Sequence, residues 1–141
     1  MDATTPDPAG NTEPVLHPPL IVVDLLGESR KAGTDYSNVV INRVNGHCLR
    51  LAVFDGDYPW HHHPASDELF LVVEGCLLLD LEDGRTLRIE PWQVATVPAG
   101  VVHRTRTVGR TVNLCFEELS ADTVFVDGHG PAVTESDESS S

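Results

Sequence analysis

The chain has 141 residues, enough for one domain with a single hydrophobic core. It carries 22 acidic and 9 basic residues, so its formal net charge at pH 7 is −13. We therefore expect no nucleic acid and no anionic membrane surface among its partners, because both would repel it. The start of the chain does not resemble a signal peptide, and no apolar run approaches the roughly 20 residues of a membrane-spanning helix. A cytoplasmic location is expected.

The two ends of the chain differ in composition from its middle. Residues 1–19 contain five prolines among acidic and polar residues, and residues 127–141 end in an acidic, serine-rich run. Such segments bury too little apolar surface to fold, so we predict a disordered N-terminal arm and a disordered acidic tail. The remaining residues, 20–126, are predicted to form one domain.

In chain order, the first candidate element is 21–26, which fits a short edge strand or one helical turn equally well. Beyond it, apolar runs separated by turn residues predict β-strands. Asn45–Gly46 indicates a type I′ hairpin, and Asp83–Gly84 indicates a second hairpin. The predicted strands are 39–44, 48–54, 68–74, 76–81, 85–90, 94–97, 102–108 and 111–117. Short strands without helical periodicity predict an all-β sandwich or barrel.

The second of these strands has two distinct faces. Leu49, Leu51 and Val53 share one face, and Arg50 lies on the other. If the face of Arg50 lines a cavity, its planar guanidinium is a candidate substrate-binding group for a carboxylate. The alternative is an arginine that reaches water at a strand edge.

The stretch 60–68 carries the clearest chemical signal. His61 and His63 are two residues apart, so in a strand they project on one face while His62 points away. Glu68 follows after a short polar bend, and His103 begins a later strand after a proline–glycine turn. Neutral imidazoles and a carboxylate suit Zn, Fe, Mn or Ni, so these residues predict a metal site.

Alternation also orients the residues that follow His103. Thr105 and Thr107 should share its inward face, which makes them candidate substrate-binding residues. Arg104 and Arg106 should then point outward as surface charges.

For several other residues, the sequence allows either a structural role or a functional one. Asp67 could accept a hydrogen bond from a ligand histidine or be a solvated loop carboxylate. Trp60 and Trp92 are interpreted as packing anchors. The cysteines form no CxxC pair and are interpreted as small buried hydrophobes, with a role near the substrate as the alternative for the last of them. They are Cys48, Cys76 and Cys115.

The spacing of the candidate ligands resembles that of small single-domain bacterial cupins of the W-H-x-H type. The first cupin motif, G-x5-H-x-H-x(3,4)-E-x6-G, is similar to the run from Gly56 to Gly75. The second, G-x5-P-x-G-x2-H-x3-N, is matched at Pro98, Gly100 and His103.

Three positions depart from these motifs. Gly56 is one residue closer to His61 than the first motif has it, Trp92 replaces the first glycine of the second motif, and Thr107 replaces its final asparagine. None of the three is a metal ligand in the family pattern.

The resemblance implies a jelly-roll barrel, also called a double-stranded β-helix. Within it, His61, His63, Glu68 and His103 would hold one divalent transition metal, with Fe, Mn, Ni, Co and Zn left open. A homodimer is usual for similar proteins.

The resemblance also implies a class of function. It suggests a metal-dependent enzyme acting on a small oxygen-chelating metabolite, as a dioxygenase in the first place, or as an isomerase or lyase. A natural-product pathway is one setting in which such short cupins act. The alternative is a non-catalytic metal-containing cupin that binds or senses a small molecule.

Overall fold

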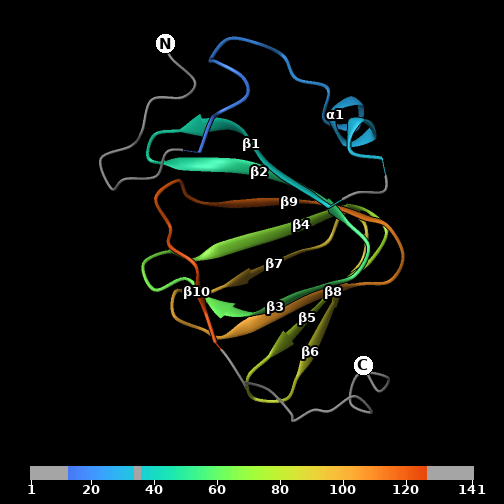
Figure 1. Cartoon of the computed structure of the whole chain (residues 1–141), viewed down its shortest axis with the longest axis vertical. Coiled ribbons are helices and arrows are strands. Elements are labelled where there is room, and N and C mark those ends of the chain that lie inside the picture. The colour runs from blue at the N-terminus through green and yellow to red at the C-terminus, as the bar shows by residue number, and fades with distance from the viewer. Residues whose placement is uncertain (1–12, 34–35, 127–141) are drawn as a thin grey trace.

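The structure is a computed structural model that describes residues 13–33 and 36–126, in which two antiparallel five-stranded sheets face each other (Figure 1). One sheet has the strand order β1-β2-β9-β4-β7 and the other β10-β3-β8-β5-β6. The elements are α1 (Leu25–Lys31), β1 (Ser37–Val44), β2 (His47–Phe54), β3 (Asp57–His62), β4 (Glu68–Glu74), β5 (Leu77–Leu81), β6 (Thr86–Ile89), β7 (Val94–Val97), β8 (His103–Thr107), β9 (Thr111–Glu118) and β10 (Val124–Phe125). The all-β jelly-roll class is confirmed, and no helix among the described residues is long and apolar enough to cross a membrane.

The first predicted hairpin is present, but its turn differs from the prediction. Val44 pairs with His47, so β1 and β2 are joined directly through Asn45 and Gly46. Asn45 is left-handed, with φ of 55°, whereas Gly46 has no positive φ. A type I′ turn needs positive φ at both positions, so the predicted turn type is wrong.

Part of the predicted disordered N-terminal arm lies against the first sheet. Val15 forms a bridge to Val40, and the backbone N–H groups of Leu16 and His17 donate to the carbonyls of Val40 and Ile41 at 2.9 and 3.0 Å. Residues 13–17 of the predicted arm therefore lie against β1. Residues 1–12 and the predicted tail, 127–141, lie outside the described residues. Of the two alternatives for 21–26, the helical one is closer, since α1 begins at Leu25.

The hydrophobic residues form separate layers inside and outside the first sheet. Phe54, Phe70 and Leu79 belong to the cluster between the two sheets. Leu51 and Val53 instead belong to a cluster on the outer face, against which residues of α1 pack. Because β2 alternates between these layers, its other face, with Arg50, is free to line the interior.

The outer face of the second sheet contains a charged cluster that corrects one prediction. Arg106 is buried, not a surface charge, and its Nε and Nη2 donate to Asp80 Oδ2 and Oδ1 at 2.6 and 2.8 Å. Arg104 is partly buried, donates to the same carboxylate at 2.8 Å and lies 5.2 Å from the ring of Trp60. Trp92 has φ of 67° and is 74% exposed, so its interpretation as a packing anchor is wrong.

Gly75, after β4, is a position where a side chain should be harmful. Its φ is +87°, and an added Cβ would lie 2.5 Å from the carbonyl oxygen of Arg110 and 2.8 Å from the Cα of Thr111. We expect Gly75→Ala to lower the free energy of unfolding by about 2–3 kcal/mol, because backbone strain and overpacking add. Gly84→Ala is the control, since Gly84 has φ of +96° with nothing within 4 Å.

Urea unfolding monitored by circular dichroism measures both changes. The Gly84 variant should lose only about 1 kcal/mol, the cost of the left-handed backbone. Equal losses in the two variants would show that the close approach at Gly75 has no energetic consequence.

Candidate metal centre

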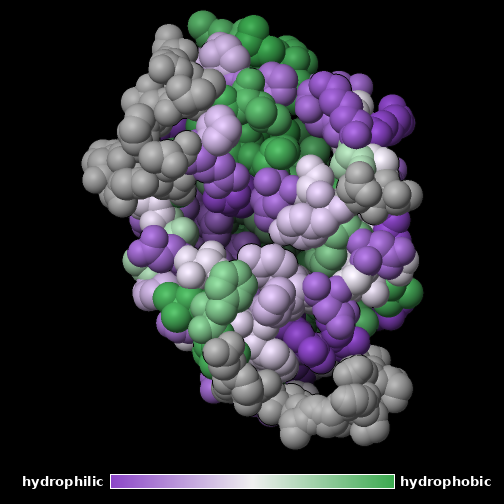
Figure 2. Space-filling model, in the orientation of Figure 1, coloured by the Kyte–Doolittle hydropathy of each residue, from purple (hydrophilic) through white to green (hydrophobic). Residues whose placement is uncertain are grey.

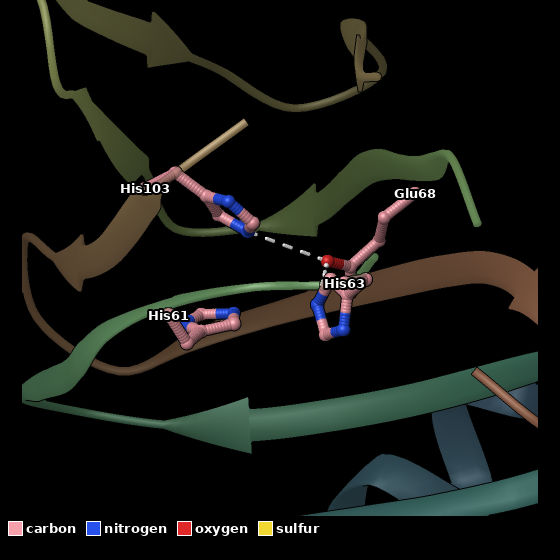
Figure 3. Close-up of side chains that lie close together, drawn as sticks. All are labelled: His61, His63, Glu68 and His103. Carbon is pink, nitrogen blue, oxygen red and sulfur yellow. Dashed lines mark ion pairs between the residues drawn. The ribbon is translucent and has the colours of Figure 1, made fainter. Parts of the chain in front are cut away.

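Four side chains from three strand ends converge inside the barrel (Figure 3). His61 lies on β3 opposite His103, the first residue of β8, and the two are partners in the strand register. Glu68 begins β4, and His63 follows directly after β3. All four side chains are buried, and one ligand atom from each lies within 4.8 Å of the others. The structure thus brings together the four residues that the sequence singled out, and this cluster could hold a metal ion.

The backbone fixes the orientation of all three imidazoles. Nδ1 lies 2.7 Å from the carbonyl oxygen of Pro59 in His61, 3.0 Å from that of Asp122 in His63, and 2.8 Å from that of Val101 in His103. A carbonyl oxygen only accepts hydrogen bonds, so each Nδ1 must carry the proton. In the neutral ring, Nε2 then presents a lone pair, as metal-binding histidines do.

The atoms that meet at the centre are unsuited to one another without a cation. Nε2 of His63 lies 2.9 Å from Oε1 of Glu68, and Nε2 of His103 lies 3.5 Å from the same oxygen. All three atoms are buried and have no hydrogen-bond partner among the described residues. With Nδ1 protonated, these are acceptors facing acceptors, which is unfavourable unless a proton or a metal ion lies between them. The donor set therefore fits a metal.

The pKa values favour the ligand forms of two members of the cluster. Burial lowers the pKa of His61 to about 4, so its ring is neutral at pH 7. Burial alone would raise the pKa of Glu68, but His103 and His63 outweigh it and lower this pKa to about 2. A neutral imidazole and an ionised carboxylate are the forms that bind metal.

A cavity of about 250 Å³ opens beside the cluster. Figure 2 shows hydrophilic side chains around a hollow, at the place in the view where Figure 1 draws the space between β2 and β3. The lining contains three of the four candidate ligands, aromatic rings and several polar groups. Apart from those ligands it comprises Glu13, Tyr36, Asn38, Arg50, Ala52, Phe54, Tyr58, Phe70, Leu77, Thr105, Asn113, Cys115 and Thr123.

The predicted substrate-binding residues fall in different places. Arg50 and Thr105 line the cavity. Thr107 does not line it, and its hydroxyl accepts a hydrogen bond from the backbone N–H of Gly56 at 2.8 Å. A substrate contact at Thr107 is therefore not supported.

The structure also places His62 and Asp67, whose roles the sequence left open. His62 stays outside the four-residue cluster, as alternation predicted. Asp67 is exposed and accepts a hydrogen bond from the backbone N–H of Ala99 at 2.9 Å, so it ties the bend before β4 to the turn before β8. Its exposed position in the loop agrees with the solvated loop carboxylate considered from the sequence, and the contact with Ala99 adds to that role.

Two acidic residues beside Arg50 are not among those predicted from the sequence. Glu117 on β9 accepts from Arg50 Nε at 2.7 Å, and Glu13 accepts from Nη1 and Nη2. Burial raises the pKa of Glu117, and the charge of Glu68 adds to this effect. Alternation along β9 could have revealed Glu117, because it shares a face with Cys115. No pattern pointed to Glu13, which lies in the predicted disordered arm.

The three cysteines are free and buried. Burial raises the pKa of Cys48 to about 11 and raises that of Cys115 well above the usual value, so both thiols are protonated at neutral pH. This agrees with their interpretation as small hydrophobes. Cys115 also lines the cavity, which leaves it beside any bound molecule.

Comparison with known proteins identifies the family. The family model described as "Cupin domain" matches residues 50–117. The uncharacterized protein YdbB of Bacillus subtilis is 48% identical over 104 residues, which cover 74% of this chain and 92% of YdbB. The polyketide synthase CurC of Streptomyces cyaneus is 31% identical over 99 residues, covering 67% of this chain and 64% of CurC.

A solved structure shares the fold as well. A chain from the crystal structures of the DMSP lyases RdDddP and RnDddQII superposes with a TM-score of 0.53 at 27% identity, covering 60% of this chain and 46% of that one. The chain has two facing antiparallel sheets and a buried cluster of three histidines and a glutamate, and the cupin model matches the strands that carry this cluster. This chain therefore belongs to the cupin family.

Proposed function

We propose that this protein is a mononuclear metal-dependent cupin enzyme acting on a small metabolite that binds the metal through oxygen. The observation that carries the proposal is the convergence of three imidazole Nε2 atoms and one carboxylate oxygen, with every Nδ1 held by a backbone carbonyl. His61, His63, Glu68 and His103 would hold the ion. It would supply Lewis-acid chemistry to a molecule bound in the cavity.

The residues around the cluster have roles of their own in this proposal. Phe54 and Phe70 exclude water from the cavity wall, which strengthens polar contacts inside it. Tyr58 lies with its ring 5.0 Å from that of His61, and burial raises its pKa, so its hydroxyl remains a hydrogen-bond donor. Thr105 and Asn113 add further polar groups that can orient a bound molecule.

The mixed nitrogen and oxygen donors are compatible with Fe, Mn, Ni, Co and Zn, and we propose one such ion per chain. The names of two similar proteins, a polyketide synthase and DMSP lyases, support an enzyme of small-molecule metabolism, in a natural-product pathway. Among reaction types we place a dioxygenase first, with isomerase and lyase as the other members of the proposal. The alternative function is a metal-containing cupin that binds or senses a small molecule without turnover.

The experiment that separates these functions begins with the metal. The tag-free protein is purified, and bound metal is measured by mass spectrometry. Candidate oxygen-chelating acids are then added to the metal-loaded protein, with absorption spectra, oxygen consumption and product formation recorded. Turnover that is lost on chelation supports the enzyme, and spectral change without turnover, aerobically and anaerobically, supports the sensor. A protein that takes up none of the five metals would refute both.

We also propose that the protein is a homodimer through its apolar outer face. Val22 is 99% exposed, and Trp92, which is 74% exposed, forms part of the wall of a groove that Leu26, Val73 and Leu114 also line. Figure 2 shows hydrophobic side chains gathered at the top of the view, over the segment that leads into α1. A second copy fits this face because a two-fold axis would place each protruding tryptophan against the groove of the partner.

Light scattering after size-exclusion chromatography should give twice the chain mass for the wild type. Trp92→Asp should shift the protein toward monomer, since it places a charge in the proposed interface. Asp57→Asn, on β3 of the opposite sheet, is the control. The measurement is made at a protein concentration of 100 μM, on the order of ten times that of a typical assay, because a higher concentration favours association by mass action. A wild type that remains monomeric at this concentration would contradict the dimer.

A further inference from the structure

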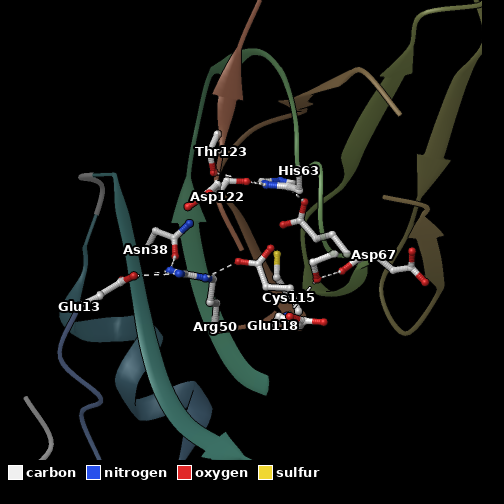
Figure 4. Close-up of polar contacts among 12 residues, drawn as sticks. Glu13, Asn38, Arg50, His63, Asp67, Cys115, Glu118, Asp122 and Thr123 are labelled. Carbon is white, nitrogen blue, oxygen red and sulfur yellow. Dashed lines mark hydrogen bonds and ion pairs between the residues drawn. The ribbon is translucent and has the colours of Figure 1, made fainter. Parts of the chain in front are cut away.

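Arg50 is held from two sides by carboxylates at the cavity (Figure 4). Its Nε donates to Oε2 of Glu117 at 2.7 Å. Its Nη1 and Nη2 donate to the two carboxylate oxygens of Glu13 at 3.0 and 2.8 Å, and Nη1 also donates to Asn38 at 3.2 Å. The pairing with Glu13 joins two nitrogens to two oxygens, which is the geometry by which a guanidinium binds a free carboxylate.

The two carboxylates differ in how easily they could leave Arg50. Glu117 projects from β9, in the middle of its sheet, and its side chain is 6% exposed. Moving it away would leave a buried charge without its partner, which is costly. The side chain of Glu13 is 32% exposed and can turn into water.

The segment that carries Glu13 lies at the edge of the first sheet, along β1. Two backbone hydrogen bonds, from Leu16 to Val40 and from His17 to Ile41, tie it there, and Val15 packs against the buried cluster of Val40, Cys48 and Leu119. All of these contacts follow Glu13 in the chain. Opening a segment at a sheet edge costs less than opening a central strand such as β9. Glu13 is therefore the exchangeable partner of Arg50.

The charges around Arg50 and the metal cluster indicate what would take its place. A divalent ion and Arg50 together supply three positive charges, while Glu68 in the cluster and Glu117 beside Arg50 supply two negative ones. One further negative charge completes the balance, and Glu13 provides it in this structure. A molecule with a single carboxylate would provide the same charge to the same nitrogens.

We propose that the ligand of this cavity carries a carboxylate that replaces Glu13 on Nη1 and Nη2 of Arg50. Residues 13–17 then form a strap that is closed by Glu13 and opens when the ligand binds. The inference rests on the proposed function for the charge of the metal ion, and it adds a substrate class: small monocarboxylates with a further oxygen that can reach the metal. Arg50 is the residue that determines this specificity.

Lactate is the probe, with the neutral lactamide as its matched analogue. Calorimetry on the Zn²⁺-loaded full-length protein should show that Glu13→Ala tightens lactate binding by about tenfold, because a tethered competitor is removed. Lactamide binding should stay unchanged. Glu90→Ala is the control. Glu90 also forms an ion pair with an arginine, Arg88 on β6, at 2.6 Å, but neither residue lines the cavity.

A second pair of variants tests whether the effect passes through Arg50. Arg50→Lys keeps the positive charge and loses the two-nitrogen geometry, so in this background Glu13→Ala should change lactate affinity less than about twofold. Hydrogen exchange of the Leu16 and His17 amides should accelerate on lactate binding to the wild type. It should also accelerate in Glu13→Ala without lactate, whether or not metal is present.

The outcomes separate this inference from the proposed function. Metal uptake together with lactate affinity that ignores Glu13→Ala would overturn the carboxylate exchange and leave the metal site intact. Absence of metal uptake would overturn the proposed function, while faster exchange at Leu16 and His17 in Glu13→Ala alone would still support the strap. No lactate binding to metal-loaded Glu13→Ala would overturn the proposed ligand class.

Discussion

His61→Ala is expected to weaken binding of the transition metal by at least about 100-fold, more than the loss of a group that only orients a ligand. Its Nε2 is one of the atoms that converge on the centre, and its neighbours cannot replace it because each imidazole is already fixed through Nδ1. Metal content after dialysis against buffered metal, measured by mass spectrometry, should fall from about one ion per chain to a small fraction of that.

The adjacent His62→Ala is the matched control. His62 is the same residue type, one position away on β3, and lies outside the cluster. Its replacement should leave metal content near that of the wild type. A His61→Ala variant that retains metal, or a His62→Ala variant that loses it equally, would contradict the assignment of the ligands.

Thermal unfolding adds a readout that separates a ligand from a structural residue. Saturating metal at about 100 times its dissociation constant should stabilise the wild type by about 2.7 kcal/mol, and it should do little for His61→Ala. Without metal, the variant should show only the loss of stability expected from truncating one buried ring. A large loss in the metal-free state alone would indicate a structural role.

The parts of this centre that the sequence predicted share a physical basis. Strand alternation is local, so the common face of His61 and His63 follows from their spacing alone. Motif spacing then added Glu68 and His103, and the register that places His103 opposite His61 explains why a residue 42 positions away joins them. The alternating faces of β2 were predictable for the same reason.

The parts that the sequence missed depend on which strands become neighbours. Arg106 lies opposite Leu78 on β5, and its buried guanidinium reaches the carboxylate of Asp80 two residues further on, a contact that nothing along either strand indicates. Glu117 meets Arg50 through the β2–β9 register, and Glu13 reaches it from a segment whose composition is typical of disorder. Trp92 shows a related failure, since alternation cannot predict a left-handed residue that turns the ring to solvent.

Asp80→Asn is expected to lower the free energy of unfolding by about 3–5 kcal/mol, the range for breaking a buried ion pair by removing one partner. The carboxylate accepts hydrogen bonds from Arg106, Arg104 and Thr86 at 2.6–2.8 Å. An asparagine cannot serve all these donors, and Arg106 would keep a buried positive charge. Asp83→Asn, which removes an exposed carboxylate from Arg85 in the next turn, should leave the free energy of unfolding close to that of the wild type.

The pH dependence of unfolding gives a second test of the same cluster. Burial alone would raise the pKa of Asp80, but the hydrogen bonds from Arg106, Thr86 and Arg104 outweigh it and lower the pKa to about 2. In the unfolded chain this pKa returns to its ordinary value near 4. The contribution of Asp80 to stability is therefore fully present above about pH 4 and is lost as the pH falls toward 2. Urea unfolding of Asp80→Asn should accordingly show a shallower loss of stability between pH 4 and pH 2 than the wild type. Parallel pH profiles for the two proteins would mean that Asp80 is as easily protonated in the folded chain as in the unfolded one, and that the buried arginine is stabilised by other groups.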